Sequence, residues 1–131
     1  MGNELSTKEY CKGLSLHKAI PIIFADHIGL KNSTGMGKVF NEIFGNPNKY
    51  SKLQIYYLWT RIKQEMTSLK RNSDCFIVSE WIDGKHLYYV VSNFNEAKRY
   101  EMRTNKKIKD LKNLIKKCYE VANKNGGRRL R

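Results

Sequence analysis

Residues 75–91, CFIVSEWIDGKHLYYVV, carry the clearest structural signal in this chain. Both halves of the stretch are rich in β-branched and aromatic residues, and Asp83-Gly84 lies between them. An Asp-Gly pair favours a two-residue type I′ turn, because both central positions of that turn need a positive φ. The stretch therefore predicts an antiparallel β-hairpin in which Ile82 pairs with Lys85.

Strand alternation gives this hairpin two faces of different composition. The first face is mainly apolar, and we expect it to lie on the helices. Its residues are Phe76, Val78, Glu80, Ile82, Lys85, Leu87, Tyr89 and Val91. The second face is more mixed, with Ile77, Ser79, Trp81, His86, Tyr88 and Val90. We expect Trp81 to pack under the hairpin.

The segment just before the hairpin predicts a long amphipathic helix over residues 51–70. Ser51 followed by Gln54 is a capping-box pattern, which marks the start of a helix. Apolar residues then recur at steps of three and four, which places them on one stripe that faces a core. These residues are Ile55, Leu58, Ile62, Met66 and Leu69.

Two shorter helices are predicted nearer the N-terminus. Residues 16–28 are apolar at helical spacing, but Pro21 means that this helix either starts near the proline or bends there. Residues 29–36 are turn-rich and predict no regular element. A short helix is expected over 37–44, and Gly-Asn-Pro-Asn at 45–48 ends it.

A final helix is predicted over residues 95–124. Its apolar positions form a narrow seam with alternating steps of three and four, which suits a coiled-coil dimer. The seam residues are Ile108, Leu111, Ile115, Cys118 and Ala122. The alternative is that the seam packs on the protein's own first helix, and the sequence leaves both open.

Positive charge is concentrated at the C-terminal end. The 131 residues carry a formal net charge of +13, of which +10 falls in residues 98–131 and +3 in residues 1–97. Such a gradient indicates an anionic partner, most often nucleic acid and less often a membrane surface, although a solvated basic helix is the plainer alternative. No apolar run approaches the roughly 18 residues of a membrane helix. Three widely spaced cysteines fit free thiols in a reducing cytoplasm.

The order of these elements resembles a known family. The segment that starts RIKQEMTSLK at Arg61 and ends KNLIKKC at Cys118 is similar to the latter part of small winged helix-turn-helix proteins of phages and prophages, and it includes NEAKRY at 95–100. The resemblance covers about residues 15–120. It departs at GNPNKY, residues 45–50, which is longer than the turn of a strict helix-turn-helix.

The resemblance implies a mainly α fold with a β-hairpin (α+β), a winged helix-turn-helix with a long C-terminal helix. Residues 1–14 would be a flexible arm, 15–94 the winged-helix domain, 95–124 the basic amphipathic helix and 125–131 a basic tail.

The same resemblance implies a non-catalytic protein that binds double-stranded DNA and regulates transcription. The third helix would enter the major groove, and the hairpin would touch the phosphate backbone. Arg and Gln can pair bidentately with base edges, whereas Lys suits phosphates. The expected DNA-binding residues are Lys52, Leu53, Tyr56, Tyr57, Thr60, Arg61, Lys63, Gln64, Lys85, His86, Arg128 and Arg129. We do not expect Trp81 to read nucleic acid.

Two other binding functions compete with DNA regulation. A winged helix can also bind proteins, and Tyr56, Tyr57 and Trp59 would then form a hot spot for a host polymerase, nuclease or defence factor. RNA binding through the basic helix ranks below both, because no RNA-specific motif is present.

The sequence offers little support for catalysis. There is no Cys-x-x-Cys pair, and His17, His27 and His86 are isolated from one another. The GMGK stretch at 35–38 lacks the spacing of a phosphate-binding loop. We therefore expect no enzyme activity, no metal and no cofactor, and we expect a protein of the cytoplasm, or of the host nucleoid if it is viral.

Overall fold

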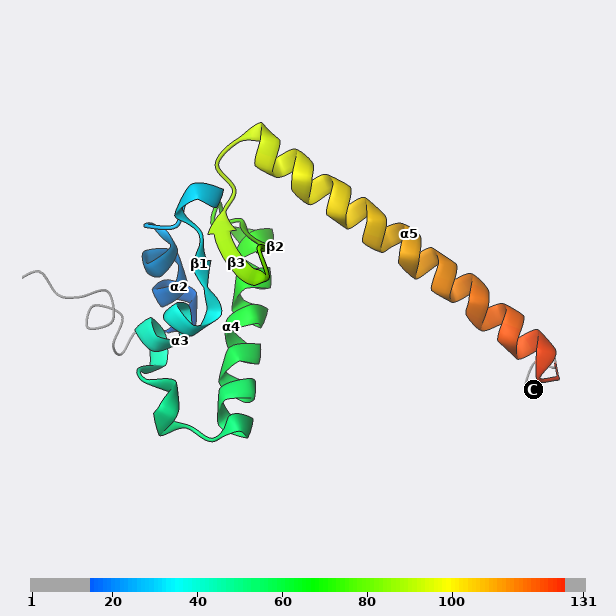
Figure 1. Ribbon diagram of the computed structural model, residues 1–131, viewed down its shortest axis with the longest axis horizontal. Helices are drawn as coiled ribbons and strands as arrows, with labels where there is room; N and C mark the ends of the chain where they lie inside the picture. The colour runs from blue at the N-terminus through cyan, green and yellow to red at the C-terminus, as the bar shows by residue number, and fades with distance from the viewer. Residues whose placement is uncertain (1–14, 127–131) are drawn as a thin grey trace, which may run out of the picture. The chain divides into compact units, whose positions relative to one another are not determined.

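The computed structural model describes residues 15–126, which form four α-helices and three β-strands (Figure 1). The chain divides after Glu96 into two units, and each is described by itself. The described part is mainly helical with a small antiparallel sheet, which confirms the α+β class. The arm expected at 1–14 lies outside the described residues, as do positions 127–131 of the expected tail.

Helix α2 spans Leu16–Phe24 and ends before Ile28, the expected end. Pro21 lies inside it, so the alternative in which the helix starts near the proline is wrong. The early end follows from pairing with the sheet. The His27 carbonyl accepts a hydrogen bond from the Val90 N–H at 2.9 Å, and the Gly29 N–H donates to the Val90 carbonyl at 2.8 Å.

A short strand, β1, follows where only turns were expected. A 3₁₀ turn, η1, covers Leu30–Asn32, and β1 covers Thr34–Gly35. This strand pairs antiparallel with Leu87 and Tyr88 of the hairpin, which makes a three-stranded sheet in the order β1-β3-β2 (Figure 1). Two residues are too few to show the alternation that marks a strand in a sequence.

Helix α3 spans Met36–Phe44 and confirms the short helix expected there. It ends at Gly45, whose φ of 90° favours glycine. A second 3₁₀ turn, η2, covers Pro47–Lys49 and occupies most of the connection to the next helix. The Tyr50 hydroxyl donates to the carbonyl of Phe44 at 2.8 Å and closes this connection onto α3.

Helix α4 spans Lys52–Asn72, and its start confirms the capping box. The Gln54 N–H donates to Ser51 Oγ at 3.2 Å, and the Ser51 N–H donates to Gln54 Oε1 at 2.8 Å. The predicted apolar stripe also holds. Ile62, Met66 and Leu69 are buried, and Ile55 and Leu58 pack partly buried against the same core.

The hairpin forms as expected, with β2 at Ile77–Ile82 and β3 at Lys85–Val90. Its register is the predicted one, from Ile82 opposite Lys85 to Val78 opposite Tyr89. The turn residues Asp83 and Gly84 have φ values of 50° and 79°, as a type I′ turn needs.

The face of the hairpin that joins the helical core is the opposite of the one expected. The core cluster of the helices includes Ile77 and Tyr88, with Val90 packed against it. Val78 and Tyr89, on the face expected to lie on the helices, are also buried but are not members of that cluster. Both faces carry buried apolar side chains, so composition alone could not identify the face that joins the helical core.

Helix α5 spans Phe94–Lys124 and confirms the long C-terminal helix. Asn93 Oδ1 accepts from the N–H of Glu96 at 2.9 Å and caps its first turn. The buried carboxylate of Glu96 accepts from the Leu30 N–H at 2.7 Å and the Ser92 N–H at 2.8 Å. Glu96 therefore ties the chain after α2 to the end of the hairpin.

Candidate nucleic-acid interface

The outward side of α4 gathers most of the side chains expected to contact DNA. Because the buried stripe fixes the rotation of the helix, the opposite residues face outward. Seven of the expected residues are exposed and Thr60 is half-buried. The exposed ones are Lys52, Leu53, Tyr56, Tyr57, Arg61, Lys63 and Gln64. The Thr60 hydroxyl donates to the carbonyl of Tyr56 at 2.8 Å, so its proton is already engaged in a hydrogen bond within the helix.

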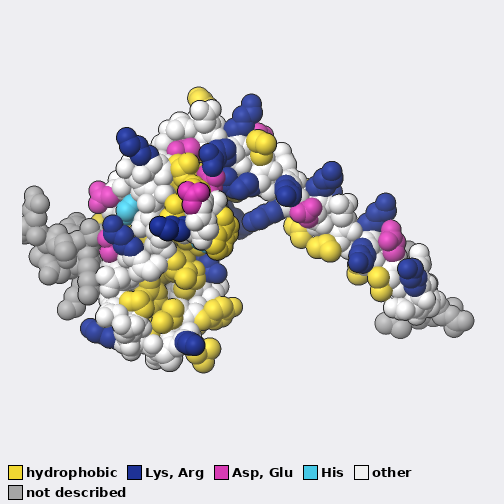
Figure 2. Space-filling model, in the orientation of Figure 1, with side chains coloured by type: hydrophobic (Ala, Val, Ile, Leu, Met, Phe, Trp, Pro, Cys, Tyr) yellow, Lys and Arg dark blue, Asp and Glu magenta, His cyan; other side chains and the backbone are white. Residues whose placement is uncertain are grey.

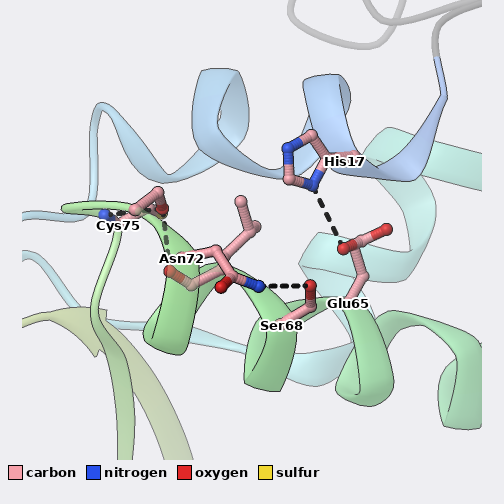
Figure 3. Close-up of polar contacts among 7 residues, drawn as sticks. His17, Glu65, Ser68, Asn72 and Cys75 are labelled. Atoms are coloured by element: carbon pink, nitrogen blue, oxygen red, sulfur yellow. Dashed lines mark hydrogen bonds and ion pairs between the residues drawn. The ribbon is translucent and has the colours of Figure 1, made fainter.

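Helix α4 is cationic. Its 21 residues include five Lys or Arg and a single acid, Glu65. That carboxylate points toward α2, where its Oε2 lies 3.2 Å from His17 Nδ1 (Figure 3). The acidic group therefore sits beside another helix, and the outward side of α4 presents cationic and neutral side chains.

The expected residues divide between two flanks of α4. Arg61 and Gln64 line an open depression together with Ser15 and Leu16, so they lie beside the start of α2. Lys63 lies on the other flank, close enough to the hairpin that its charge helps to lower the pKa of His86. The larger cause of the lowered pKa is burial of the imidazole.

The middle of the outward side is apolar. An open depression there is lined by Leu53, Gln54, Tyr56, Tyr57 and Thr60. Leu53, Tyr56 and Tyr57 are 78%, 69% and 62% exposed. Trp59, in contrast, is buried against Tyr88, so its expected place in an exposed hot spot with the two tyrosines is wrong. It falls on the same side of the helix as Ile62 and Met66, which the spacing of the stripe already indicated.

The hairpin tip carries a pair of stacked rings that the sequence reasoning missed. Trp81 and His86 are cross-strand partners, and their rings are nearly parallel, 4.7 Å apart between centroids and inclined by 6°. Trp81 is 72% exposed, so the expectation that it packs under the hairpin is wrong. Cross-strand pairing of Trp81 with His86 was predicted by the Asp83-Gly84 turn and was the available signal.

The remaining expected contacts are placed only in part. Lys85 is exposed at the tip, but strand alternation turns it to the face opposite His86. Arg128 and Arg129 lie outside the described residues.

The apolar seam of α5 is exposed in the second unit. Ile108, Leu111 and Ile115 are 44%, 60% and 60% exposed, and Cys118 and Ala122 are exposed as well. Lys and Arg side chains recur along this helix with apolar side chains between them (Figure 2). The helix thus combines a cationic surface with an apolar stripe.

Among residues 15–126, no group of three His, Cys, Asp or Glu side chains is placed to hold a metal ion. In the same part of the chain, no helix combines the length and the apolar character needed to cross a membrane.

Comparison of the chain with protein-family models, with curated proteins and with solved structures gives no match.

Proposed function

We propose that this protein is a winged-helix protein that binds double-stranded DNA and regulates transcription in a phage or other mobile element. Helix α4 would lie in the major groove, and the β2–β3 hairpin would contact the backbone. The observation that carries the proposal is the cationic, exposed side of α4, whose Lys63 lies one turn beyond Trp59, the residue that packs on Tyr88 of the hairpin. Such a protein would act in the host cytoplasm or nucleoid.

The arrangement of elements supports the winged-helix assignment. Helices α2, α3 and α4 precede the hairpin, and β1 joins the hairpin as a third strand between α2 and α3. The major groove of B-DNA is about 12 Å wide and admits an α-helix. The stretch of α4 from Leu53 to Gln64 is about 17 Å long at 1.5 Å per residue, so it can follow several base pairs.

The test is binding to duplex DNA selected from a random pool, read at two salt concentrations. Neutralising about six phosphates gives a log–log salt slope of about −5. Arg61→Ala should cost about 1–3 kcal/mol on the selected site and less on random duplex, because a base contact is lost. Lys31→Ala, which removes one exposed charge from η1, is the matched control and should change the affinity for neither duplex. Equal losses on both duplexes for Arg61→Ala would contradict the assigned base contact.

A second candidate function is binding to a host protein, such as a polymerase, nuclease or defence factor. The apolar depression around Tyr56 and Tyr57 favours it, because exposed aromatic side chains are enriched in protein interfaces. Two results together would favour this candidate over DNA binding. The wild type, but not Tyr57→Ala, would capture a stoichiometric partner protein from nuclease-treated lysate, and the wild type would not shift DNA at moderate salt.

Self-association through α5 is part of the proposal. The seam from Ile108 to Ala122 keeps the steps of a heptad over two repeats, and its residues are exposed. A dimer formed in this way would read a two-fold symmetric site with half-sites spaced by turns of the DNA helix.

A further inference from the structure

The stacked pair of Trp81 and His86 presents a flat aromatic surface at the hairpin tip. The two residues face each other across β2 and β3, and their rings are inclined by only 6°. They share the sheet face of Ile77 and Tyr88, which are buried in the helical core nearer the other end of the hairpin. Toward the tip that face passes beyond the core, and Trp81 is 72% exposed.

A series of ring contacts connects this surface to the core. His86 lies 4.7 Å from Tyr88 between ring centroids, and the Tyr88 hydroxyl is 3.3 Å from His86 Nδ1. Tyr88 in turn meets Trp59 edge to face at 5.6 Å, and both of these rings are buried. The indole of Trp81 therefore rests on a supported ring and loses little conformational freedom when it binds a ligand.

The charges around the stacked pair favour an anionic ligand. Lys63 follows Trp59 by one turn on the same side of α4, and Trp59 packs on Tyr88, the neighbour of His86, so Lys63 lies on the flank of α4 that faces the hairpin. The hairpin has two acidic residues, Glu80 and Asp83. Glu80 is buried on the other face, where it accepts a hydrogen bond from the Tyr89 hydroxyl, and Asp83 lies in the turn. A planar ring beside a cation matches a nucleotide, which has a flat base and a phosphate.

We propose that Trp81, stacked on His86, binds an unpaired base of nucleic acid, with Lys63 at the adjoining phosphate. Inside a duplex both faces of each base are covered by neighbouring bases, so the indole can stack only on a single strand, an overhang or a duplex end. This inference rests on the proposed DNA binding, and it adds that the protein prefers DNA in which duplex meets unpaired bases.

The experiment compares three probes by fluorescence anisotropy: a blunt duplex of about 20 base pairs, the same duplex with an overhang of about five thymidines, and a single strand of about twelve thymidines. We expect the overhang to tighten binding between about fivefold and about a hundredfold, the range of one stacked base. Trp81→Ala should remove this gain, measured as the ratio of overhang affinity to blunt-duplex affinity of the same protein, and Trp81→Phe should keep most of the gain. Tyr119→Ala, which removes a ring that is also 72% exposed, is the matched control and should keep all of it.

Intrinsic fluorescence gives a second readout, because Trp59 and Trp81 are the two tryptophans of the chain. Stacking should quench the emission of the wild type on addition of the thymidine strand, and Trp81→Phe should abolish the quenching. The inference would be overturned if the overhang does not increase affinity, or if the increase persists in Trp81→Ala. Tight binding of the blunt duplex would in either case still support DNA binding. Trp81-dependent binding of the single strand without duplex binding would overturn the duplex proposal and uphold the stacked pair.

Discussion

Gly29 shows how one residue holds the first unit together. Its φ is +86°, and a Cβ built there would lie 2.9 Å from Ser92 Oγ and 3.6 Å from the carboxylate of Glu96. Any side chain would thus meet both backbone strain and the carboxylate of Glu96, which ties the chain after α2 to the end of the hairpin. Gly29→Ala should lower the free energy of unfolding by about 1–3 kcal/mol.

Urea unfolding followed by circular dichroism measures this change. Gly37→Ala is the control, because it adds the same methyl group to the first turn of α3 with nothing within 4 Å. Its stability should stay the same or rise, since alanine favours a helix. Equal stability of Gly29→Ala and the wild type would show that the close approach relaxes at no cost.

His86 predicts how stability and binding depend on pH. Burial first and the charge of Lys63 second lower the pKa of His86, and Tyr88 is the other titratable group that contacts its ring. The unfolded state therefore binds the proton more readily, so stability should fall as pH drops from about 6.5 toward the folded pKa. A phosphate near the ring would favour the protonated form, so DNA affinity should rise over the same window.

The measurement compares the wild type with His86→Gln at about pH 7.5 and about pH 5.5, which lie above and below the usual histidine pKa of about 6.5. When the pH drops from the higher value to the lower, we expect His86→Gln to lose less stability and to gain less DNA affinity than the wild type. Identical pH responses in the two proteins would remove His86 from both effects.

Among the elements, α4 depends on its first turn. Ser51 and Gln54 exchange two hydrogen bonds there, which satisfy two N–H groups that a helix start leaves open. Ser51→Ala should cost about 1 kcal/mol of stability and weaken any function of Leu53 to Thr60. Ser15→Ala is the matched control, because Ser15 holds the same position before α2 with no side-chain cap bond. Chemical denaturation measures the free energy of unfolding of both variants. An equal loss in the two would contradict the role of the Ser51 cap.

The sequence predicted those elements whose signals are local. The Asp83-Gly84 turn defined the hairpin register, and the apolar spacing of α4 defined its buried stripe. It did not predict β1, because a two-residue strand exists only through its partner β3. It placed the wrong hairpin face in the core cluster of the helices, because which face joins that cluster depends on where α4 packs.

The candidate site, like the fold, was predicted only where local signals define it. Helical periodicity identified the exposed side of α4 in advance, from Leu53 to Gln64. Its division into a flank beside α2 and a flank beside the hairpin needed tertiary structure, since Lys63 and His86 are far apart in the sequence. The exposure of Trp81 needed it too, because a tryptophan in a strand is more often covered.

For the whole molecule, the α5 seam predicts the oligomeric state. We expect sedimentation equilibrium at micromolar concentration to show a dimer, and Leu111→Lys to shift it to monomer, because a charge would enter the apolar contact. Met102→Lys adds the same charge at another exposed apolar position of α5, which is 67% exposed, and should leave the dimer intact. A wild type that sediments as a monomer would remove both the dimer and the two-fold symmetric site.

The pairing of β1 with β3 determines when the first unit can fold. Thr34 can pair only once Tyr88 is present, and the bridge of Ile28 to Val90 joins positions that are even farther apart along the chain. Closing such long loops costs entropy before any contact repays it, which slows folding. A nascent chain on the ribosome therefore completes α2, α3 and α4 without the strand that would hold β1 in place, and its native state becomes accessible only after synthesis has passed the hairpin.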